Sequence, residues 1–85
     1  MKSSTTASFR SRLLGLSPEV QSLARKNFKL WLRDAHHPSI QFKKAGRFWS
    51  ARVGLDYRAV AIMEQGRMKW FWIGPHDEYE RLIGG

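Results

Sequence analysis

Apolar side chains recur every three or four positions in the first half of the chain, which is the spacing of one helical face. Residues 17–19 read Ser-Pro-Glu, a strong helix start, because serine caps free amides while proline and an acid suit the first turn. Residues 36–38, His-His-Pro, are predicted to end this helix, since a residue before proline is pushed out of the α region. Its apolar face consists of Val20, Leu23, Ala24, Phe28, Trp31 and Ala35.

A shorter helix is predicted over residues 8–14, where Phe9, Leu13 and Leu14 share helical spacing and Gly15 can end the helix. The residues before it are small and polar, and they lack the apolar centre of a signal peptide. We therefore expect residues 1–7 to be disordered, with a brief strand before the helix, which the sequence does not define, as the alternative.

The second half of the chain is rich in aromatic and β-branched residues and predicts a three-stranded antiparallel meander over residues 48–73. Its first turn is a three-residue loop at residues 54–56, and its second is a tight hairpin at residues 65–66, Gln-Gly. Residues 39–46 are expected to form a strand or an extended connector before it. In the expected register, four side chains share one face and pack small against large: Ala59, Ala61, Trp70 and Trp72.

After the last strand, Gly74 and Pro75 lead into a short amphipathic helix that begins near His76. The order of elements indicates one α+β domain over residues 1–85. We expect two N-terminal helices packed on a twisted antiparallel sheet of three to four strands, followed by the short C-terminal helix.

The composition limits the kinds of partner that such a domain is expected to bind. The 15 Lys and Arg against 7 Asp and Glu give a net charge of +8, and most of the excess lies between residues 10 and 69. A basic body of this kind favours a polyanion such as nucleic acid, or an acidic protein. The chain has no cysteine and no apolar run long enough to span a membrane, so a cytoplasmic protein is expected.

The sheet is predicted to bring two arginines together. If the first hairpin loop has three residues, Arg52 lies directly opposite Arg58 on the neighbouring strand. Like charges in this position destabilise a sheet unless an anion or a neutral group intervenes, and paired guanidiniums suit a phosphate. The alternative is a structural ion pair between one of these arginines and a nearby acid, namely Asp56, Glu78 or Glu80.

His76 is predicted to lie where the last strand becomes a helix, at the end of the sheet that also holds Arg58. An imidazole in this position can act as a general acid or base near neutral pH, and Tyr79 follows within one helical turn. The other two histidines, His36 and His37, are adjacent and cannot share a helical face. No other cysteine or histidine lies at metal-ligand spacing from them, so no metal site is expected.

Four segments, in this order, resemble the RelE/ParE toxin superfamily: S-P-E-V-Q-S-L-A-R-K, H-H-P-S-I-Q-F-K-K, A-R-V-G-L-D-Y-R-A-V and W-F-W-I-G-P-H-D-E-Y-E-R-L-I. The resemblance runs from about Phe9 to the end of the chain and is strongest to small chromosomal members that close on W-F-W-I-G-x-H-x-x-Y. It implies a RelE/ParE-like fold and the toxin half of a type II toxin–antitoxin pair.

The resemblance also implies a chemistry. RelE-like members cleave mRNA in the ribosomal A site, where the 2′-hydroxyl attacks the adjacent phosphate without a metal or a small-molecule cofactor. By position, Arg58 matches the arginine that contacts the scissile phosphate, His76 is the candidate general acid, and Arg52 matches a basic strand residue. Tyr79 lies near the position of a C-terminal tyrosine that some relatives use. The expected RNA phosphate contacts are Lys43, Lys44, Arg47 and Arg67.

Two other functions remain open from the sequence. ParE-like members of the superfamily inhibit DNA gyrase and cleave nothing, and a basic domain can also be a plain nucleic-acid-binding module. The sequence gives only a weak signal for the N-terminal strand that is common in the family. Pro75 stands where many relatives have a small residue. His76 favours the mRNA endonuclease, whose partners are then mRNA on the ribosome and a cognate antitoxin. An acidic or amphipathic antitoxin segment is expected to wrap the basic surface or displace the C-terminal helix.

Overall fold

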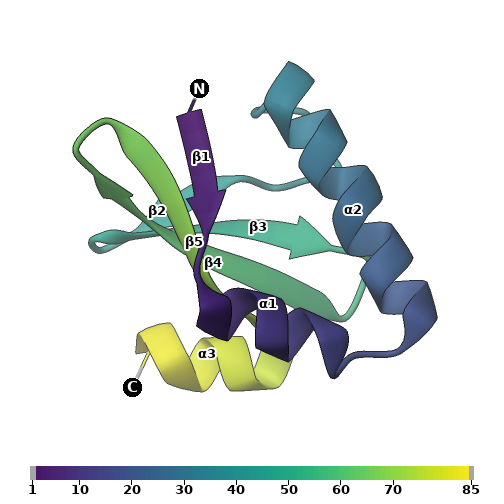
Figure 1. The fold of residues 1–85 in the computed structure, drawn as a ribbon. Coiled ribbons are helices and arrows are strands. Elements are labelled where there is room, and N and C mark those ends of the chain that lie inside the picture. The colour runs from purple at the N-terminus through teal and green to yellow at the C-terminus, as the bar shows by residue number, and fades with distance from the viewer. Residues whose placement is uncertain (1, 85) are drawn as a thin grey trace.

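A mixed sheet and three helices make up the computed structural model, which describes residues 2–84 (Figure 1). In chain order the elements are β1 (Lys2–Thr5), α1 (Ala7–Leu14), α2 (Pro18–Arg33), β2 (Lys43–Ala45), β3 (Phe48–Val53), β4 (Tyr57–Glu64), β5 (Arg67–Pro75) and α3 (His76–Gly84). The strands lie in the order β1-β5-β4-β3-β2. The α+β class is confirmed. The predicted arrangement is corrected, because a strand precedes the two helices and the sheet has five strands.

The first strand, β1, occupies most of the segment expected to be disordered. It pairs in parallel with the edge of β5, with Thr5 opposite Trp70, so the sheet is not purely antiparallel. The prediction failed because Lys-Ser-Ser-Thr has no alternating apolar pattern. Backbone hydrogen bonds to β5 hold this strand, and any residue type except proline can supply them. Met1 lies outside the described residues.

The connection between α2 and β2 also differs from its prediction. The helix ends at Arg33, so the two histidines expected to end it lie beyond it. Residues 39–42 form turns and irregular backbone, and only Lys43–Ala45 is a strand. Ile40 in this connection is nevertheless fully buried, and its carbonyl accepts a hydrogen bond from the Arg52 amide at 2.6 Å. The connection is therefore anchored beside β3.

Both hairpin turns follow the predicted chemistry. Gln65 and Gly66 have φ angles of 52° and 76°, and two positive values characterise the turn that suits a two-residue hairpin. The three-residue loop after β3 sets Arg52 opposite Arg58, as predicted, and Gly54 supplies a left-handed residue with φ of 64°. Local sequence thus determines the register at both ends of β4.

A β-bulge within β5 changes which side chains share a face. Ala61 lies opposite Trp70, but the next residue of β4, Val60, lies opposite Trp72, so Phe71 is the extra residue. Neighbouring residues of β4 point to opposite faces of the sheet. Trp70 and Trp72 therefore lie on opposite faces, and the prediction that they share one is wrong.

The bulge also places Arg58 opposite Gly74 rather than opposite Ile73. Gly74 leaves room for the Trp72 indole, since a Cβ at this position would lie 2.7 Å from that ring. The Arg12 guanidinium lies over the same ring, 4.9 Å from its centroid, and its Nε donates a hydrogen bond to the Ile73 carbonyl at 2.9 Å. These contacts attach α1 to the end of β5.

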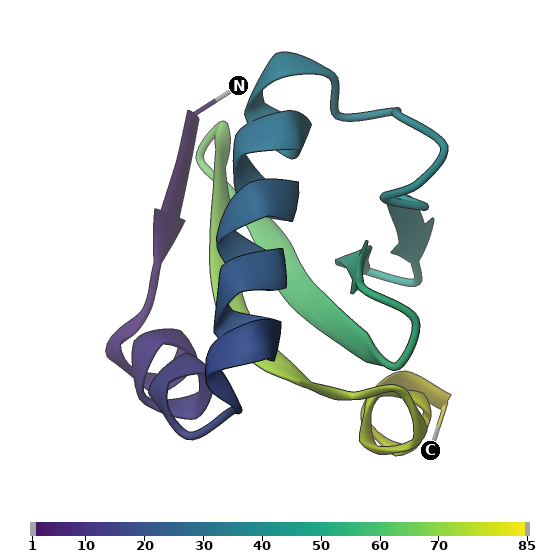
Figure 2. The same cartoon turned by 90° about the vertical axis from the view of Figure 1, so that its right-hand side faces the viewer.

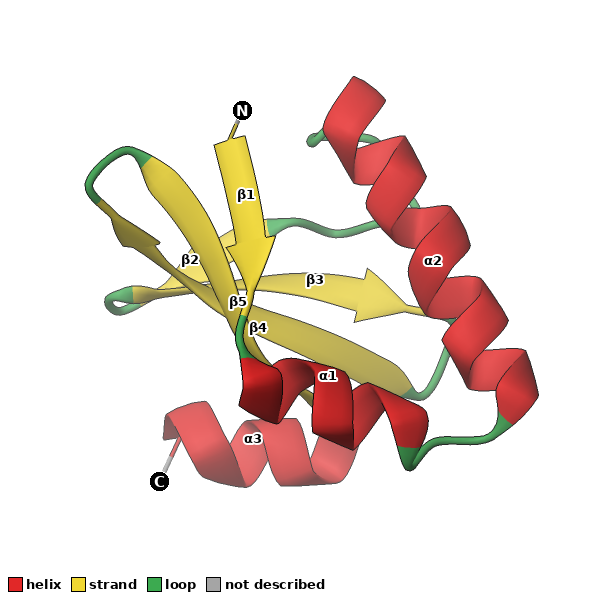
Figure 3. Cartoon of the chain, in the orientation of Figure 1, coloured by secondary structure: helices red, strands yellow, loops and turns green. Residues whose placement is uncertain are grey.

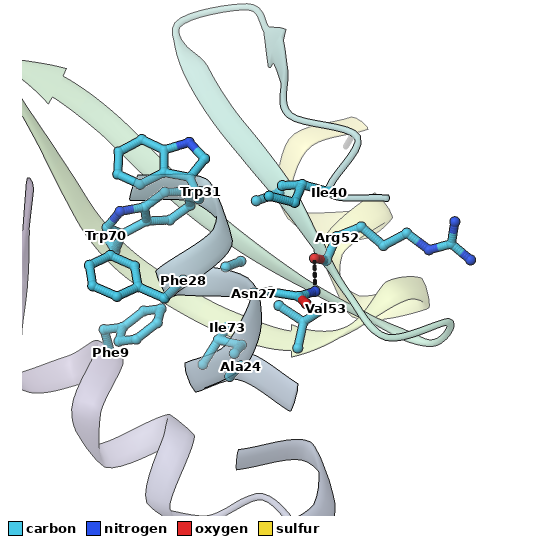
Figure 4. Close-up of a pocket in the computed structure, with 12 residues that line it drawn as sticks. Phe9, Ala24, Asn27, Phe28, Trp31, Ile40, Arg52, Val53, Trp70 and Ile73 are labelled. Carbon is cyan, nitrogen blue, oxygen red and sulfur yellow. Dashed lines mark hydrogen bonds between the residues drawn. The ribbon is translucent and has the colours of Figure 1, made fainter. Parts of the chain in front are cut away.

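The hydrophobic core lies between α2 and the face of the sheet that α2 covers (Figure 2). Trp31 of α2 meets Trp70 of β5 edge to face, with ring centroids 5.4 Å apart. A cavity of about 40 Å³ remains between α2 and the sheet, lined mostly by apolar side chains (Figure 4). The lining atoms lack dispersion partners across this void, so packing here is looser than in a filled core.

The other face of the sheet is covered at one end by α3. The two short helices, α1 and α3, lie close to the same end of the sheet (Figure 3), whereas α2 lies across one of its faces (Figure 2). Tyr79 is the buried residue of α3, and its hydroxyl reaches β3. None of the helices within residues 2–84 has the length and apolar composition that a membrane crossing requires.

Truncation of Trp31 tests the packing of α2 on the sheet. Trp31→Ala removes an indole that is 2 % exposed, and it should lower the free energy of unfolding by about 3–5 kcal/mol. Leu32→Ala, one position along the same helix, removes a side chain that is 49 % exposed and should cost less than about 1 kcal/mol. Urea unfolding followed by far-UV circular dichroism measures both. Equal losses in the two variants would contradict this core.

Candidate active site

Three segments meet at the end of the sheet where β3 turns into β4. The antiparallel pairing puts Arg52 and Arg58 side by side. His76 reaches the same end because its amide donates a hydrogen bond to the Asp56 carbonyl in the β3–β4 loop at 2.8 Å, which holds the start of α3 against that loop (Figure 2). The predicted convergence of Arg58 and His76 is confirmed. Their pocket of about 280 Å³ is lined by Gln41, Arg52, Leu55, Tyr57, Arg58 and His76.

Arg58 is a buried arginine whose donors are only partly used. Its side chain is 3 % exposed, and its Nη2 donates hydrogen bonds to the Gln41 carbonyl and the Ser50 Oγ, each at 3.1 Å. Its guanidinium carbon lies over the Tyr79 ring, 5.0 Å from the centroid. Its Nε is buried and has no hydrogen-bond partner within residues 2–84. A buried polar donor without a partner lowers the stability of the fold.

Two of the acids that could neutralise the arginine pair are engaged with other residues. Glu78 lies 3.6 Å from Nη2 of Arg12, and Glu80 lies 2.8 Å from Nε2 of His76. In the described part of the chain, neither arginine of the pair forms an ion pair. The structural alternative predicted from the sequence is therefore not realised. The pair presents two uncompensated positive charges to one pocket.

Burial lowers the pKa of Arg58 below its ordinary value, because removal from water disfavours the charged form. The neighbouring Arg52 acts in the same direction, whereas Tyr79 acts in the opposite direction. The folded protein therefore holds this proton less tightly than the unfolded chain does. The charge lowers stability at every pH below the folded-state pKa, and this cost disappears only as pH rises through that value. An anion beside Arg58 offsets the cost at neutral pH.

His76 lies at the rim of the pocket and remains accessible. Its side chain is 49 % exposed, its Nε2 lies 2.8 Å from Oε1 of Glu80, and its ring stacks on Tyr79 with centroids 5.7 Å apart. The carboxylate and the stacked ring orient the imidazole, while solvent can still exchange protons with it. These are the requirements of a general acid or base.

The four residues that were predicted to contact RNA do not all lie together in the structure. Lys43 and Lys44 of β2 line a groove of about 490 Å³ that His76 and α3 share, so they adjoin the pocket. Arg47 lies in the turn between β2 and β3, with its guanidinium carbon 5.2 Å from the Phe48 ring centroid. Arg67 begins β5, at the opposite end of the β4–β5 ladder from the site. The fold therefore brings together the two lysines and His76, but not Arg67.

Two contributors to the site were missed from the sequence. Ser50 is 1 % exposed and hydrogen-bonds both Arg58 and Tyr79. A small polar residue inside an apolar strand was a usable signal. Gln41 contributes its main-chain carbonyl, and its φ of 48° places it in the left-handed region. The sequence carries no signal for this contribution, because every residue type has a main-chain carbonyl.

Comparisons of the chain with family models, with curated proteins and with solved structures gave no match. The chemistry of the site itself is therefore the basis for a function. Two uncompensated guanidiniums can bind a phosphate through charge-assisted hydrogen bonds. The accessible imidazole beside them can transfer a proton to or from an oxygen of that phosphate.

Thermal unfolding with inorganic pyrophosphate tests the pocket. The anion should raise the Tm of the wild type above that in chloride of equal ionic strength, and at 100 times Kd the stabilisation is about 2.7 kcal/mol. Arg58→Met should remove most of this increase and keep the fold, because an apolar chain then replaces a buried charge. Arg47→Met, outside the pocket, should retain it. An increase that survives in Arg58→Met would show that the anion binds elsewhere.

Proposed function

We propose that the protein is a RelE-like toxin of a type II toxin–antitoxin pair, which cleaves mRNA in the ribosomal A site. The observation that carries the proposal is the convergence of Arg52, Arg58 and His76 on one pocket in which neither arginine forms an ion pair within residues 2–84. The four segments that resemble the RelE/ParE superfamily support the same assignment. We place the activity in the cytoplasm, where its substrate lies.

The first step is attack of the 2′-hydroxyl on the adjacent phosphate. The 2′-hydroxyl gives its proton to solvent, and its oxygen forms a bond to phosphorus while the bond to the 5′-oxygen of the next nucleotide breaks. One product then ends in a cyclic phosphate and the other begins with a 5′-hydroxyl. Extra negative charge develops on the non-bridging oxygens. Arg58 and Arg52 both line the pocket, and we assign to them the hydrogen bonds to these oxygens. The burial of Arg58 keeps its charge poorly screened. Electrostatic stabilisation is thus the main contribution of the arginine pair.

The second requirement is a proton for the departing 5′-oxygen. His76 lies at the rim of the same pocket with an exposed ring, and we assign it the role of general acid. Tyr79 was a candidate catalytic residue from the sequence. Its side chain is 3 % exposed and its hydroxyl donates a hydrogen bond to Ser50 at 2.9 Å, so we assign it a supporting role behind Arg58.

The RNA backbone is proposed to continue from the pocket into the groove beside it. Lys43 and Lys44 line this groove together with His76, and their ammonium groups suit the phosphates of neighbouring nucleotides. The outer face of α2 adds further positive charge through Arg25, Lys26, Lys29 and Arg33. A cognate antitoxin with an acidic or amphipathic segment would neutralise this surface.

Cleavage of mRNA on programmed ribosomes tests the assignment. The wild type should cut within the A-site codon, and His76→Ala should lower kcat by about 10²–10⁴-fold, because the general acid is lost. His36→Ala, which removes an exposed histidine outside the pocket, is the matched control and should cut at the wild-type rate. Primer extension maps the cuts.

Two outcomes would contradict the proposal. Cutting that persists unchanged in His76→Ala would remove the histidine from the mechanism. Growth arrest on induction with intact mRNA and loss of DNA supercoiling would instead support the ParE-like alternative, a non-enzymatic gyrase inhibitor.

A further inference from the structure

Ser50 lies at the point where β3, β4 and α3 meet. It is 1 % exposed, and its Oγ accepts a hydrogen bond from Nη2 of Arg58 at 3.1 Å and another from the Tyr79 hydroxyl at 2.9 Å. A serine oxygen has two lone pairs, and these two donors occupy both. A single buried oxygen thus connects the candidate phosphate-binding arginine to the C-terminal helix.

The contacts around Arg58 hold its guanidinium in one orientation. Nη2 is held by Ser50 and by the Gln41 carbonyl, each at 3.1 Å, while the Tyr79 ring lies against the guanidinium, 5.0 Å from its carbon. Nε is left without a partner in residues 2–84. The protein therefore uses one nitrogen and one face of the group for support.

We infer that Ser50 is a positioning residue, whose hydroxyl fixes the Arg58 guanidinium for phosphate binding and couples it to the docked position of α3. The inference rests on the proposed function, since it concerns the arginine to which the scissile phosphate is assigned. An arginine side chain loses considerable rotamer freedom when it is ordered. A site in which this ordering precedes ligand binding loses less free energy when the phosphate arrives.

A purely structural role for Ser50 makes a different prediction. The Tyr79 hydroxyl bond attaches α3 to β3, so Ser50→Ala could act by loosening this helix alone. Tyr79→Phe removes that same hydrogen bond but keeps the ring against Arg58 and the bond between Arg58 and Ser50. If Ser50 only attaches α3, the two variants should behave alike. If Ser50 positions Arg58, Ser50→Ala should be clearly worse.

Nitrogen-15 NMR of the arginine side chains tests the positioning directly. In the wild type, the Arg58 guanidinium should rotate slowly and show separate Nη signals, because Nη2 is hydrogen-bonded twice. Ser50→Ala should merge these signals or broaden them, Tyr79→Phe should keep them apart, and Ser50→Thr, which retains a hydroxyl, should restore them. Signals that stay separate in Ser50→Ala would overturn the inference. Far-UV circular dichroism confirms that each variant is folded.

Pyrophosphate binding supplies a second readout that does not depend on cleavage. Ser50→Ala should raise the Kd for pyrophosphate by about tenfold, the effect of one hydrogen bond to a charged group, whereas Tyr79→Phe should raise it by less than about threefold. Equal changes in the two variants would show that Ser50 acts only through α3. If the NMR and binding results are as expected but the wild type leaves ribosomal mRNA intact, the proposed function fails and the positioning role of Ser50 stands.

Discussion

The burial of the Arg58 guanidinium beside a second arginine, without an acid among residues 2–84 to neutralise it, is the constraint on which the rest of the site depends. A charge removed from water must be hydrogen-bonded or paired. Here a serine hydroxyl, a main-chain carbonyl and an aromatic ring surround the group, and none of them carries a formal charge. The surroundings hold the cation in place and leave its charge for a ligand.

The folding of three separate segments is needed to build this environment. The β3–β4 register places Ser50 two residues before Arg52 on the face that Arg58 also occupies. The bulge in β5 puts Gly74 opposite Arg58, and Gly74 leaves room for the Trp72 ring. The helix α3 then begins at once, with His76 at the rim and Tyr79 beneath the guanidinium. A shift of one residue in the β3–β4 register, in the position of the bulge or in the start of α3 would remove a side chain from the site.

At Arg58, the burial of a charge that the proposed function uses lowers the stability of the fold. The core between α2 and the opposite face is apolar and centred on Trp31 and Trp70, and it supplies hydrophobic stabilisation. Burial lowers the pKa of Arg58, so a charge on the other face is held at some expense of stability. Such a cost at a preorganised site is consistent with a role in stabilising charge that develops during a reaction.

Local sequence was sufficient for the parts of the structure that local physics controls. Helix-start chemistry at residues 17–19 and turn chemistry at residues 65–66 predicted α2 and the second hairpin, and the three-residue loop predicted that Arg52 faces Arg58. Each depends on dihedral angles and hydrogen bonds within a few residues. The residue pair at the centre of the site was therefore visible before the structure was known.

Contacts between segments distant along the chain determined the parts of the structure that the sequence did not predict. β1 forms because the edge of β5 has free backbone groups, and its polar residues give no sign of this. The bulge at Phe71 separates Trp70 from Trp72, although strict alternation predicts one face for both. The contacts of Ser50 with Tyr79 and of Arg58 with the Gln41 carbonyl join residues distant along the chain. No local pattern encodes such contacts, because they depend on how separate elements pack against one another.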